Sequence, residues 1–298
     1  MTHSHFILDA LDYLLVGAGG MVLVLAAWRW RRAGGRDPLR GSPVRANRLN
    51  LIAVWCCLMA YAAGGMAGVW LGRAWTPGGI GGKVKESWES VLASSMTQVV
   101  VVASCVVVAM LFFRARLAGF GLGRRFGATA GWTGWWIAGG LLASFCCTGV
   151  VVLAAQWVIR LLWPDFRPPE HGVFTTLNSS QATLAMRILA IGGAAVLAPM
   201  GEECLFRGIL QTGIKKLMPP RRGSVYHRWA AIWLTATAFG LLHVATPQFV
   251  PALIVLGVIL GYLYERTGSL WVPIVVHMLF NAKSLLWYHV QAHVAGMH

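Results

Sequence analysis

The stretch PMGEECLFR, residues 199–207, places two carboxylates and one guanidinium, those of Glu202, Glu203 and Arg207, in apolar surroundings. Apolar residues precede it over 188–198 and follow it over 208–210. An ionised side chain at the centre of a bilayer costs about 2.5–3.5 kcal/mol even on the lenient insertion scale. Three such groups within six residues therefore indicate a functional site, and the remainder of the chain is interpreted around it.

The spacing of these three charges predicts different roles for the two glutamates. On a helix, Glu203 and Arg207 stand at positions i and i+4 of one face, in the favourable order with the acid first. Glu202 is turned away by about 100°. Because Arg207 can neutralise only one glutamate well, we expect Glu203 and Arg207 to brace the helix and Glu202 to face a cavity.

The composition indicates a membrane protein. The 298 residues are 57% hydrophobic and 12% charged, with a mean hydropathy of +0.63, whereas soluble domains carry about 25% charged residues. The formal net charge of +15 comes from basic residues clustered between apolar runs, as the positive-inside rule expects, rather than from one groove-sized patch. We therefore expect no nucleic-acid partner.

Apolar runs of bilayer length define the predicted architecture. Each run is long enough to cross the hydrocarbon core or comes close to that length. The chain is predicted to be an all-α, polytopic membrane helix bundle of about eight transmembrane helices. The runs cover about 6–28, 51–71, 91–113, 132–162, 182–215, 229–244, 249–264 and 270–288.

The chain divides into two parts within one integral membrane domain. Residues 1–180 have no ionisable residue well inside an apolar run, and they are predicted to be amino-terminal scaffold helices. Residues 181–290 carry all the intramembrane polar clusters that we single out and are predicted to form the catalytic core. Small residues in the first part, such as the Gly64-Gly65 pair, favour close helix packing.

Charge asymmetry predicts the orientation. The loops after the odd-numbered runs hold seven, four, five and one Lys or Arg residues, over 29–48, 114–125, 215–228 and at Arg266, whereas the loops after the even-numbered runs hold three, one and none. The basic side is therefore expected to be cytoplasmic and both termini outside. Glu202 would then share a depth with His243 only if the fifth helix continues to about Lys216, with a kink at Pro199.

Two further polar clusters follow the glutamates along the chain. Phe239 and His243 end the sixth run, and His277 and Asn281 stand four residues apart in the eighth, on one helical face. A glutamate in an apolar cavity can act as a base near neutral pH. A histidine beside it can orient water, and a second histidine with an asparagine amide can stabilise an oxyanion. This set of residues is suited to amide hydrolysis.

These three motifs, in this order and each in an apolar run, resemble those of the CAAX protease and bacteriocin-processing (CPBP) family. The family consists of intramembrane peptidases and includes the Ras-converting CAAX prenyl endopeptidases. The resemblance covers about residues 184–288 and includes the segment 257–277 that leads to the last motif. The motifs are Glu202-Glu203-x-x-x-Arg207, Phe239-x-x-x-His243 and His277-x-x-x-Asn281.

The resemblance implies a role for each motif residue. Glu202 matches the catalytic glutamate that activates water together with His243. His277 and Asn281 match the oxyanion-hole positions. Glu203 belongs to the same predicted catalytic set and forms the motif's supporting pair with Arg207. Arg207 and Phe239 are expected to give structural support.

Two mechanisms remain open for such a set of residues. We favour a metal-free glutamic mechanism without a cofactor, because a histidine and asparagine pair suits oxyanion donation better than coordination. The alternative is a zinc protease, in which Glu202, His243 and His277 would supply three ligands and water the fourth.

The predicted function is therefore that of an intramembrane endopeptidase, a hydrolase that acts on a peptide or lipopeptide substrate in contact with membrane lipid. We expect an integral membrane protein of the bacterial cytoplasmic membrane. Two other classes use similar residues: a non-catalytic immunity or scaffold protein that binds a peptide or lipidated partner in the same cavity, and a proton-coupled transporter with Glu202, His243 and His277 as a relay.

Overall fold

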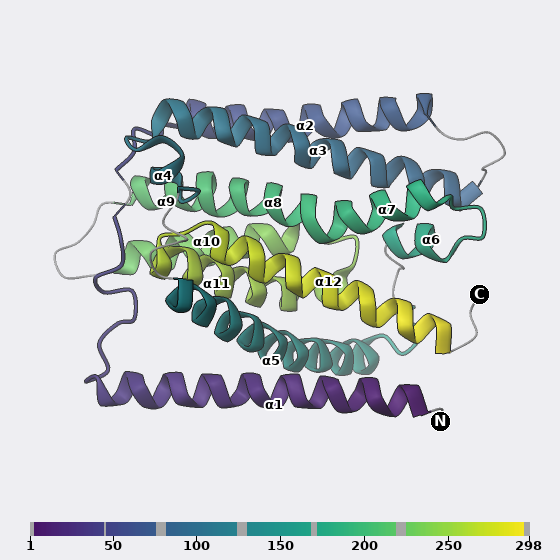
Figure 1. Ribbon diagram of the computed structural model, residues 1–298, viewed down its shortest axis with the longest axis horizontal. Coiled ribbons are helices and arrows are strands. Elements are labelled where there is room, and N and C mark those ends of the chain that lie inside the picture. The colour runs from purple at the N-terminus through teal and green to yellow at the C-terminus, as the bar shows by residue number, and fades with distance from the viewer. Residues whose placement is uncertain are drawn as a thin grey trace.

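The computed structural model describes residues 3–44, 46–75, 82–123, 130–167, 172–218 and 225–294. These residues form helices and connecting turns (Figure 1). The basic residues Arg45, Arg124, Arg125, Arg221 and Arg222, which entered the orientation argument, lie outside the described residues. In chain order the elements are α1 (His3–Arg32), α2 (Leu51–Ala74), α3 (Gly82–Phe112), α4 (Arg116–Phe120), α5 (Ala130–Leu162), α6 (Gly172–Asn178), α7 (Leu184–Gly192), η1 (Gly193–Leu197), α8 (Ala198–Glu203), η2 (Cys204–Gln211), α9 (Thr212–Leu217), α10 (Tyr226–Leu241), η3 (Pro247–Phe249), α11 (Val250–Thr267) and α12 (Trp271–Val294).

The predicted all-α membrane bundle is confirmed, although the count of eight spans is not. Each of the eight apolar runs coincides with helical structure. Within the described residues, six helical segments are long and apolar enough to cross a membrane. Of the other two, α10 has only 16 residues, and α12 carries His277, Asn281 and Lys283 within its length.

The segment that carries the glutamates is one long helical rod. Residues Leu184–Leu217 form a continuous span of 34 residues, so the predicted extension of the fifth helix to about Lys216 is confirmed. Two parts of the rod, η1 and η2, are π-helical and flank α8. The N–H of Ala198 donates to the carbonyl of Gly193, five residues back. The irregularity expected at Pro199 therefore takes the form of a π-helical segment directly before the proline.

The short α10 brings His243 to the depth of the glutamates. α10 and α11 extend over only part of the bundle's length, whereas α3 and α12 run along most of it (Figure 1). The chain turns back just after α10, and the side chain of Phe239 in the last turn of α10 is buried. There, the ring of Phe239 lies 5.3 Å from the ring of Phe206 in η2.

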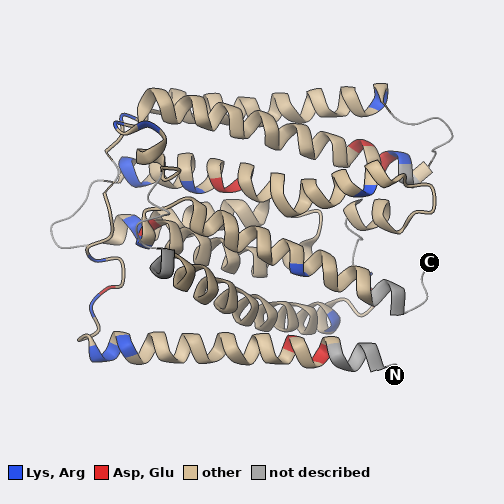
Figure 2. Cartoon of the chain, viewed as in Figure 1, with Lys and Arg blue, Asp and Glu red and all other residues tan. Residues whose placement is uncertain are grey.

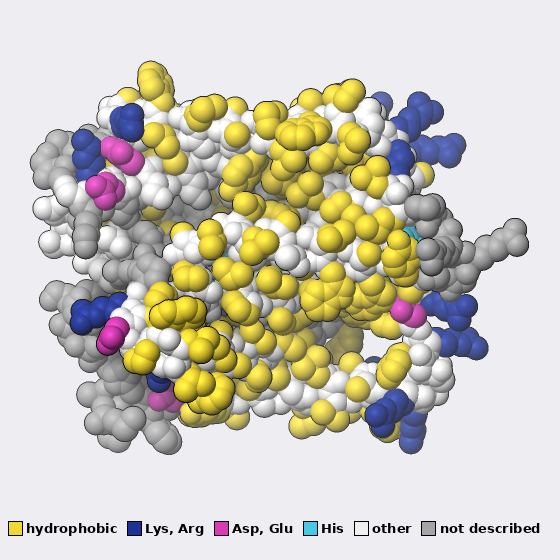
Figure 3. Space-filling model, turned by 180° about the vertical axis from the view of Figure 1, so that it is seen from behind, with side chains coloured by type: hydrophobic (Ala, Val, Ile, Leu, Met, Phe, Trp, Pro, Cys, Tyr) yellow, Lys and Arg dark blue, Asp and Glu magenta, His cyan; other side chains and the backbone are white. Residues whose placement is uncertain are grey.

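Charged side chains gather at the two ends of the bundle. Figure 2 shows most of the Lys and Arg at the end where α1 and α9 finish, while the acidic residues of α1 lie at the opposite end. The visible face in Figure 3 is mostly hydrophobic between these ends. This arrangement is that of an integral membrane protein. The assignment of the basic end to the cytoplasm remains a prediction.

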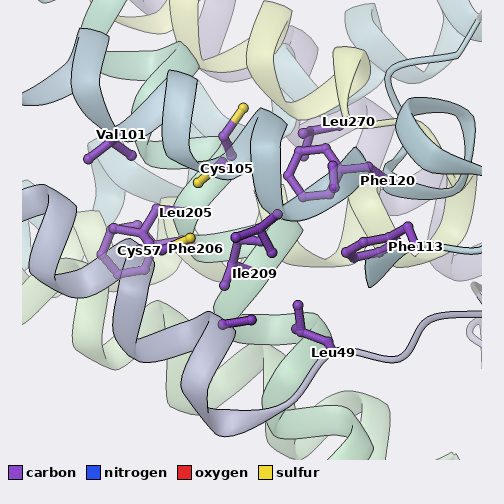
Figure 4. Packing of buried hydrophobic residues seen from close by; sticks show 14 of the residues in the cluster. Leu49, Cys57, Val101, Cys105, Phe113, Phe120, Leu205, Phe206, Ile209 and Leu270 are labelled. Atoms are coloured by element: carbon purple, nitrogen blue, oxygen red, sulfur yellow. The ribbon is translucent and has the colours of Figure 1, made fainter. Parts of the chain in front are cut away.

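The helices of the two parts of the chain share one apolar core. Side chains from α2 and α3 pack directly against η2, as Figure 4 shows for Cys57, Val101, Cys105, Phe206 and Ile209. Glycines let α2 approach α3 closely: a Cβ at Gly68 would lie 2.4 Å from the Cα of Ala93. The boundary proposed near residue 180 stays a prediction, and the core extends across it.

Candidate active site

Glu203 and Arg207 form the predicted brace. Arg207 Nη1 lies 2.9 Å from Glu203 Oε1, and the side chains are 1% and 0% exposed. Arg207 Nη2 also donates to the carbonyl of Gly257 in α11, at 3.2 Å. The guanidinium therefore ties the glutamate helix to α11, and its charge is balanced inside the bundle.

His277 of α12 connects the two glutamates. Its Nδ1 lies 3.0 Å from Glu203 Oε1, and its Nε2 lies 3.7 Å from Glu202 Oε2. The residue is 2% exposed. Because a carboxylate can only accept, the Nδ1 proton is donated to Glu203, and this hydrogen bond fixes the direction of the ring.

Glu202 is the glutamate that stays accessible. Its side chain is 16% exposed, against 0% for Glu203. His277, His243, Glu203 and Arg207 all interact with it electrostatically. The ion pair of Glu203 with Arg207 agrees with the predicted brace. The expectation that Glu202 faces a cavity stays a prediction.

His243 lies in the turn that follows α10. Its Nδ1 is 2.8 Å from the carbonyl oxygen of Phe239, so Nδ1 carries a proton and donates it. The neutral ring then presents Nε2 as an acceptor. A histidine in this tautomer can accept a hydrogen bond from water.

The ring of Phe239 lies at the centre of the polar groups. It is 1% exposed. Its centroid lies 5.0 Å from His243, 5.8 Å from His277 and 5.0 Å from Arg207 Cζ. Phe239 therefore holds both imidazoles and the guanidinium apart at fixed spacings while excluding water from Arg207.

Asn281 contacts the same rod one turn along α12. Its Nδ2 donates to the carbonyl of Ala194 in η1, at 2.9 Å. The expectation that His277 and Asn281 share a helical face agrees with this contact, because both side chains meet the Leu184–Leu217 rod. The bond to Ala194 was not predicted, since a backbone acceptor exposed by a π-helical segment leaves no signal in the sequence.

Sequence reasoning also missed two residues of the first part of the chain. Gln98 of α3 packs against Gly201, the residue before Glu202. Tyr61 of α2 interacts electrostatically with Glu202. The signal for Gln98 is a polar amide inside the apolar run 91–113.

No group of three or more His, Cys, Asp or Glu residues in the described parts of the chain is arranged to hold a metal ion. Glu202, His243 and His277 remain the residues that would supply ligands in the zinc alternative, and that choice is left to experiment.

The fold and the site together define an all-α integral membrane protein in which two adjacent glutamates lie beside His277 of α12 and interact with His243 after α10. Residues 184–283 match the family model described as type II CAAX prenyl endopeptidase Rce1-like. This match confirms the family resemblance seen in the motifs, over about the last third of the chain, and supports a protease.

One curated relative extends the comparison. The chain is 25% identical over 136 residues to YpbD, an uncharacterized protein of Bacillus subtilis (strain 168). The match covers 45% of this chain and 61% of the relative. No solved structure matches the chain.

Proposed function

We propose that this chain is an intramembrane endopeptidase in which Glu202 and His243 activate water for attack on a peptide bond. The observation that supports the proposal is that two adjacent glutamates differ in burial and in their partners. Glu203 is fully buried in a charge pair with Arg207, whereas Glu202 is accessible and lies beside His277. A structural pair needs only one of these carboxylates, so the second is available for chemistry.

The carboxylate of Glu202 and Nε2 of His243 can both accept a hydrogen bond, which suits them to activate one water molecule. Glu202 removes a proton from water while His243 Nε2 accepts the second hydrogen bond and orients the molecule. The water oxygen bonds to the carbonyl carbon of the substrate. Glu202 then delivers its proton to the amide nitrogen as the carbon–nitrogen bond breaks, which releases an amine and a carboxylic acid.

His277 and Asn281 are suited to hold the oxyanion. Nδ1 of His277 donates to Glu203, which fixes the direction of the ring, and a proton on Nε2 would donate to the developing negative charge. An asparagine amide nitrogen has two hydrogens, and the carbonyl of Ala194 uses one of them. The second hydrogen can therefore donate to the oxyanion without breaking the bond to Ala194.

The surroundings of the site favour a membrane-embedded peptide or lipopeptide substrate. An apolar hollow of about 590 Å³ extends along α7 and η1, with Ile188, Val196 and Leu197 among its lining residues. It ends five residues before Glu202 in the same rod. A substrate side chain or lipid in this hollow would lie in apolar contact with the enzyme. The location we propose is the cytoplasmic membrane of a bacterium.

The test is cleavage of a mixed peptide and lipopeptide library by purified protein in detergent, read by mass spectrometry. Wild type is compared with Glu202→Gln and His243→Ala, each with and without a chelator. Cleavage by wild type that is lost in both variants and survives the chelator supports the glutamate mechanism, and loss with the chelator supports zinc. Absence of cleavage by wild type, or equal cleavage by the variants, would favour a binding or scaffold protein.

A further inference from the structure

Helix α3 presents buried polar groups to the glutamate helix. Gln98 is 5% exposed, as is Ser95, three residues before it on the same face. Gln98 Oε1 and Ser95 Oγ have no hydrogen-bond partner among the described residues. Burying a polar group without a partner costs free energy, and the cost is larger in a membrane, where water cannot compensate. A polar amide kept at such a position therefore has a reason to be there.

The amide of Gln98 is aimed at the backbone next to Glu202. A Cβ built at Gly201 would lie 2.0 Å from Gln98 Oε1, so the amide oxygen rests directly against Gly201. Ser95 makes the equivalent approach to Gly193, where a Cβ would lie 2.8 Å from its Oγ. Two polar atoms of one α3 face thus touch the rod at the start of η1 and at the residue before Glu202.

This contact lies at α8, where the helical hydrogen bonding of the rod alone does not fix the direction in which Glu202 points. α8 has six residues and lies between two π-helical segments. A π-helical turn holds one more residue than an α-helical turn, so the exchange of one form for the other rotates the residues beyond it by about 100°. Such a rotation would remove Glu202 from the Nε2 of His277, 3.7 Å away. A fixed contact from outside the rod prevents it.

Tyr61 of α2 lies near the same level. The contacts of Gly68 with Ala93 and of Gly64 with Thr97 set the antiparallel register of α2 and α3. Tyr61 lies one turn before Gly64 in α2. The antiparallel register therefore places it opposite the turn of α3 that follows Gln98. The phenol interacts electrostatically with Glu202. Helices α2 and α3 thus both contribute polar groups on the side of the rod that carries Glu202.

We infer that Gln98 is a positioning residue, which holds the Gly201–Glu202 turn against α3 in the register that directs Glu202 to His277. The helices of the first part of the chain then form one wall of the active site, beyond the scaffold role expected from the sequence. The inference rests on the proposed function for its effect on turnover, but the position of Glu202 can be measured without any substrate.

The substrate-free measurement is modification of Glu202 by a hydrophobic carbodiimide, which reacts with protonated carboxyl groups, followed across pH by peptide mass spectrometry. The charged or titratable groups facing Glu202 are Glu203 and Arg207 of its own rod, His277 of α12, His243 after α10 and Tyr61 of α2. None of them is changed in the variants used.

The decisive variant is Gln98→Glu, with Ser94→Glu as a matched control on the exposed face of the same helix. A carboxylate at position 98 should raise the pH midpoint of Glu202 modification by about one unit, because a nearby like charge disfavours ionisation. The control should leave the midpoint unchanged. Equal midpoints in wild type, Gln98→Glu and Ser94→Glu would overturn the inference.

A second variant tests position rather than charge. Gln98→Asn keeps the amide but shortens the side chain by one methylene, so contact with Gly201 is lost. We expect about a tenfold decrease in kcat with KM unchanged for a cleaved peptide, and a changed rate of carbodiimide modification at Glu202. Wild-type kcat together with a wild-type modification rate would contradict the inference. If wild type cleaves no peptide, the proposed function fails, and the carbodiimide comparison still decides the role of Gln98.

Discussion

Replacement of Arg207 by Met should destabilise the protein strongly, because it leaves Glu203 as an unbalanced charge in the core. The paired atoms are 2.9 Å apart, and the side chains are 1% and 0% exposed. At an effective dielectric constant of 20, two unit charges at this separation attract by about 6 kcal/mol. Part of this attraction offsets desolvation, and removal of one partner from a buried pair typically costs about 3–5 kcal/mol.

The assay is a double-mutant cycle measured by reversible unfolding in mild detergent, with Arg207→Met, Glu203→Gln and the double variant. Arg207→Met should lower the free energy of unfolding by about 3–5 kcal/mol. The double variant should be more stable than the sum of the two single effects predicts, by at least about 2 kcal/mol. Arg114→Met, at an exposed guanidinium, should change the free energy of unfolding by less than about 0.5 kcal/mol.

Additive effects would refute this reasoning. If the double variant loses the sum of the single losses to within about 0.5 kcal/mol, the two side chains are energetically independent. The short distance would then contribute nothing to stability, and Glu203 would be free for a role other than the brace.

Three further predictions concern residues outside the candidate active site. Glu265→Ala should lower the free energy of unfolding by about 3 kcal/mol, because the buried carboxylate pairs with Lys215 at 2.7 Å and Arg228 at 2.9 Å; a change below about 0.5 kcal/mol in denaturant unfolding would contradict this. Gly68→Val should cost about 1–3 kcal/mol by forcing α2 away from Ala93, and an unchanged melting temperature would be inconsistent with the close helix contact. Burial lowers the pKa of His227 from 6.5, and the neighbouring Arg228 and Lys215 lower it further, so its contribution to stability is complete above about pH 6.5 and is lost as the pH falls below that value. His227→Gln should therefore make stability less dependent on pH between about pH 7 and 5, and identical pH profiles would count against this assignment.

Much of the site could be predicted because it depends on local spacing. The i, i+4 relation of Glu203 and Arg207 is a property of any helix, and the pair forms in the structure. His277 could be assigned to the same site because polar residues in an apolar span must face a partner or a cavity. The depth of Glu202 and His243 also followed, once the rod was extended to about Lys216.

Other features depend on contacts that the sequence does not encode locally. The π-helical segments η1 and η2 arise from a change in backbone hydrogen bonding, which leaves the apolar pattern intact. The partner of Asn281 is a backbone carbonyl of such a segment. The contact between Gln98 and Gly201 joins two helices about one hundred residues apart in the chain, and no local spacing pattern relates the two residues.

The number of spans could not be settled from apolar length alone. α10 is an apolar helix of 16 residues, and at about 1.5 Å per residue it is shorter than a bilayer core of about 30 Å. Phe239 in its last turn lies beside His243, His277 and Arg207. The same shortness that weakens its prediction as a span places His243 beside Glu202.

The most direct test of the central claim is a single-turnover cleavage in ¹⁸O-labelled water of a peptide found to be cleaved. Direct attack by water held at Glu202 predicts one ¹⁸O atom in the new carboxylate of the product and none in the side chain of Glu202, with no product from Glu202→Gln. Incorporation of ¹⁸O into Glu202, or cleavage by Glu202→Gln at the wild-type rate, would contradict the claim that this glutamate activates water.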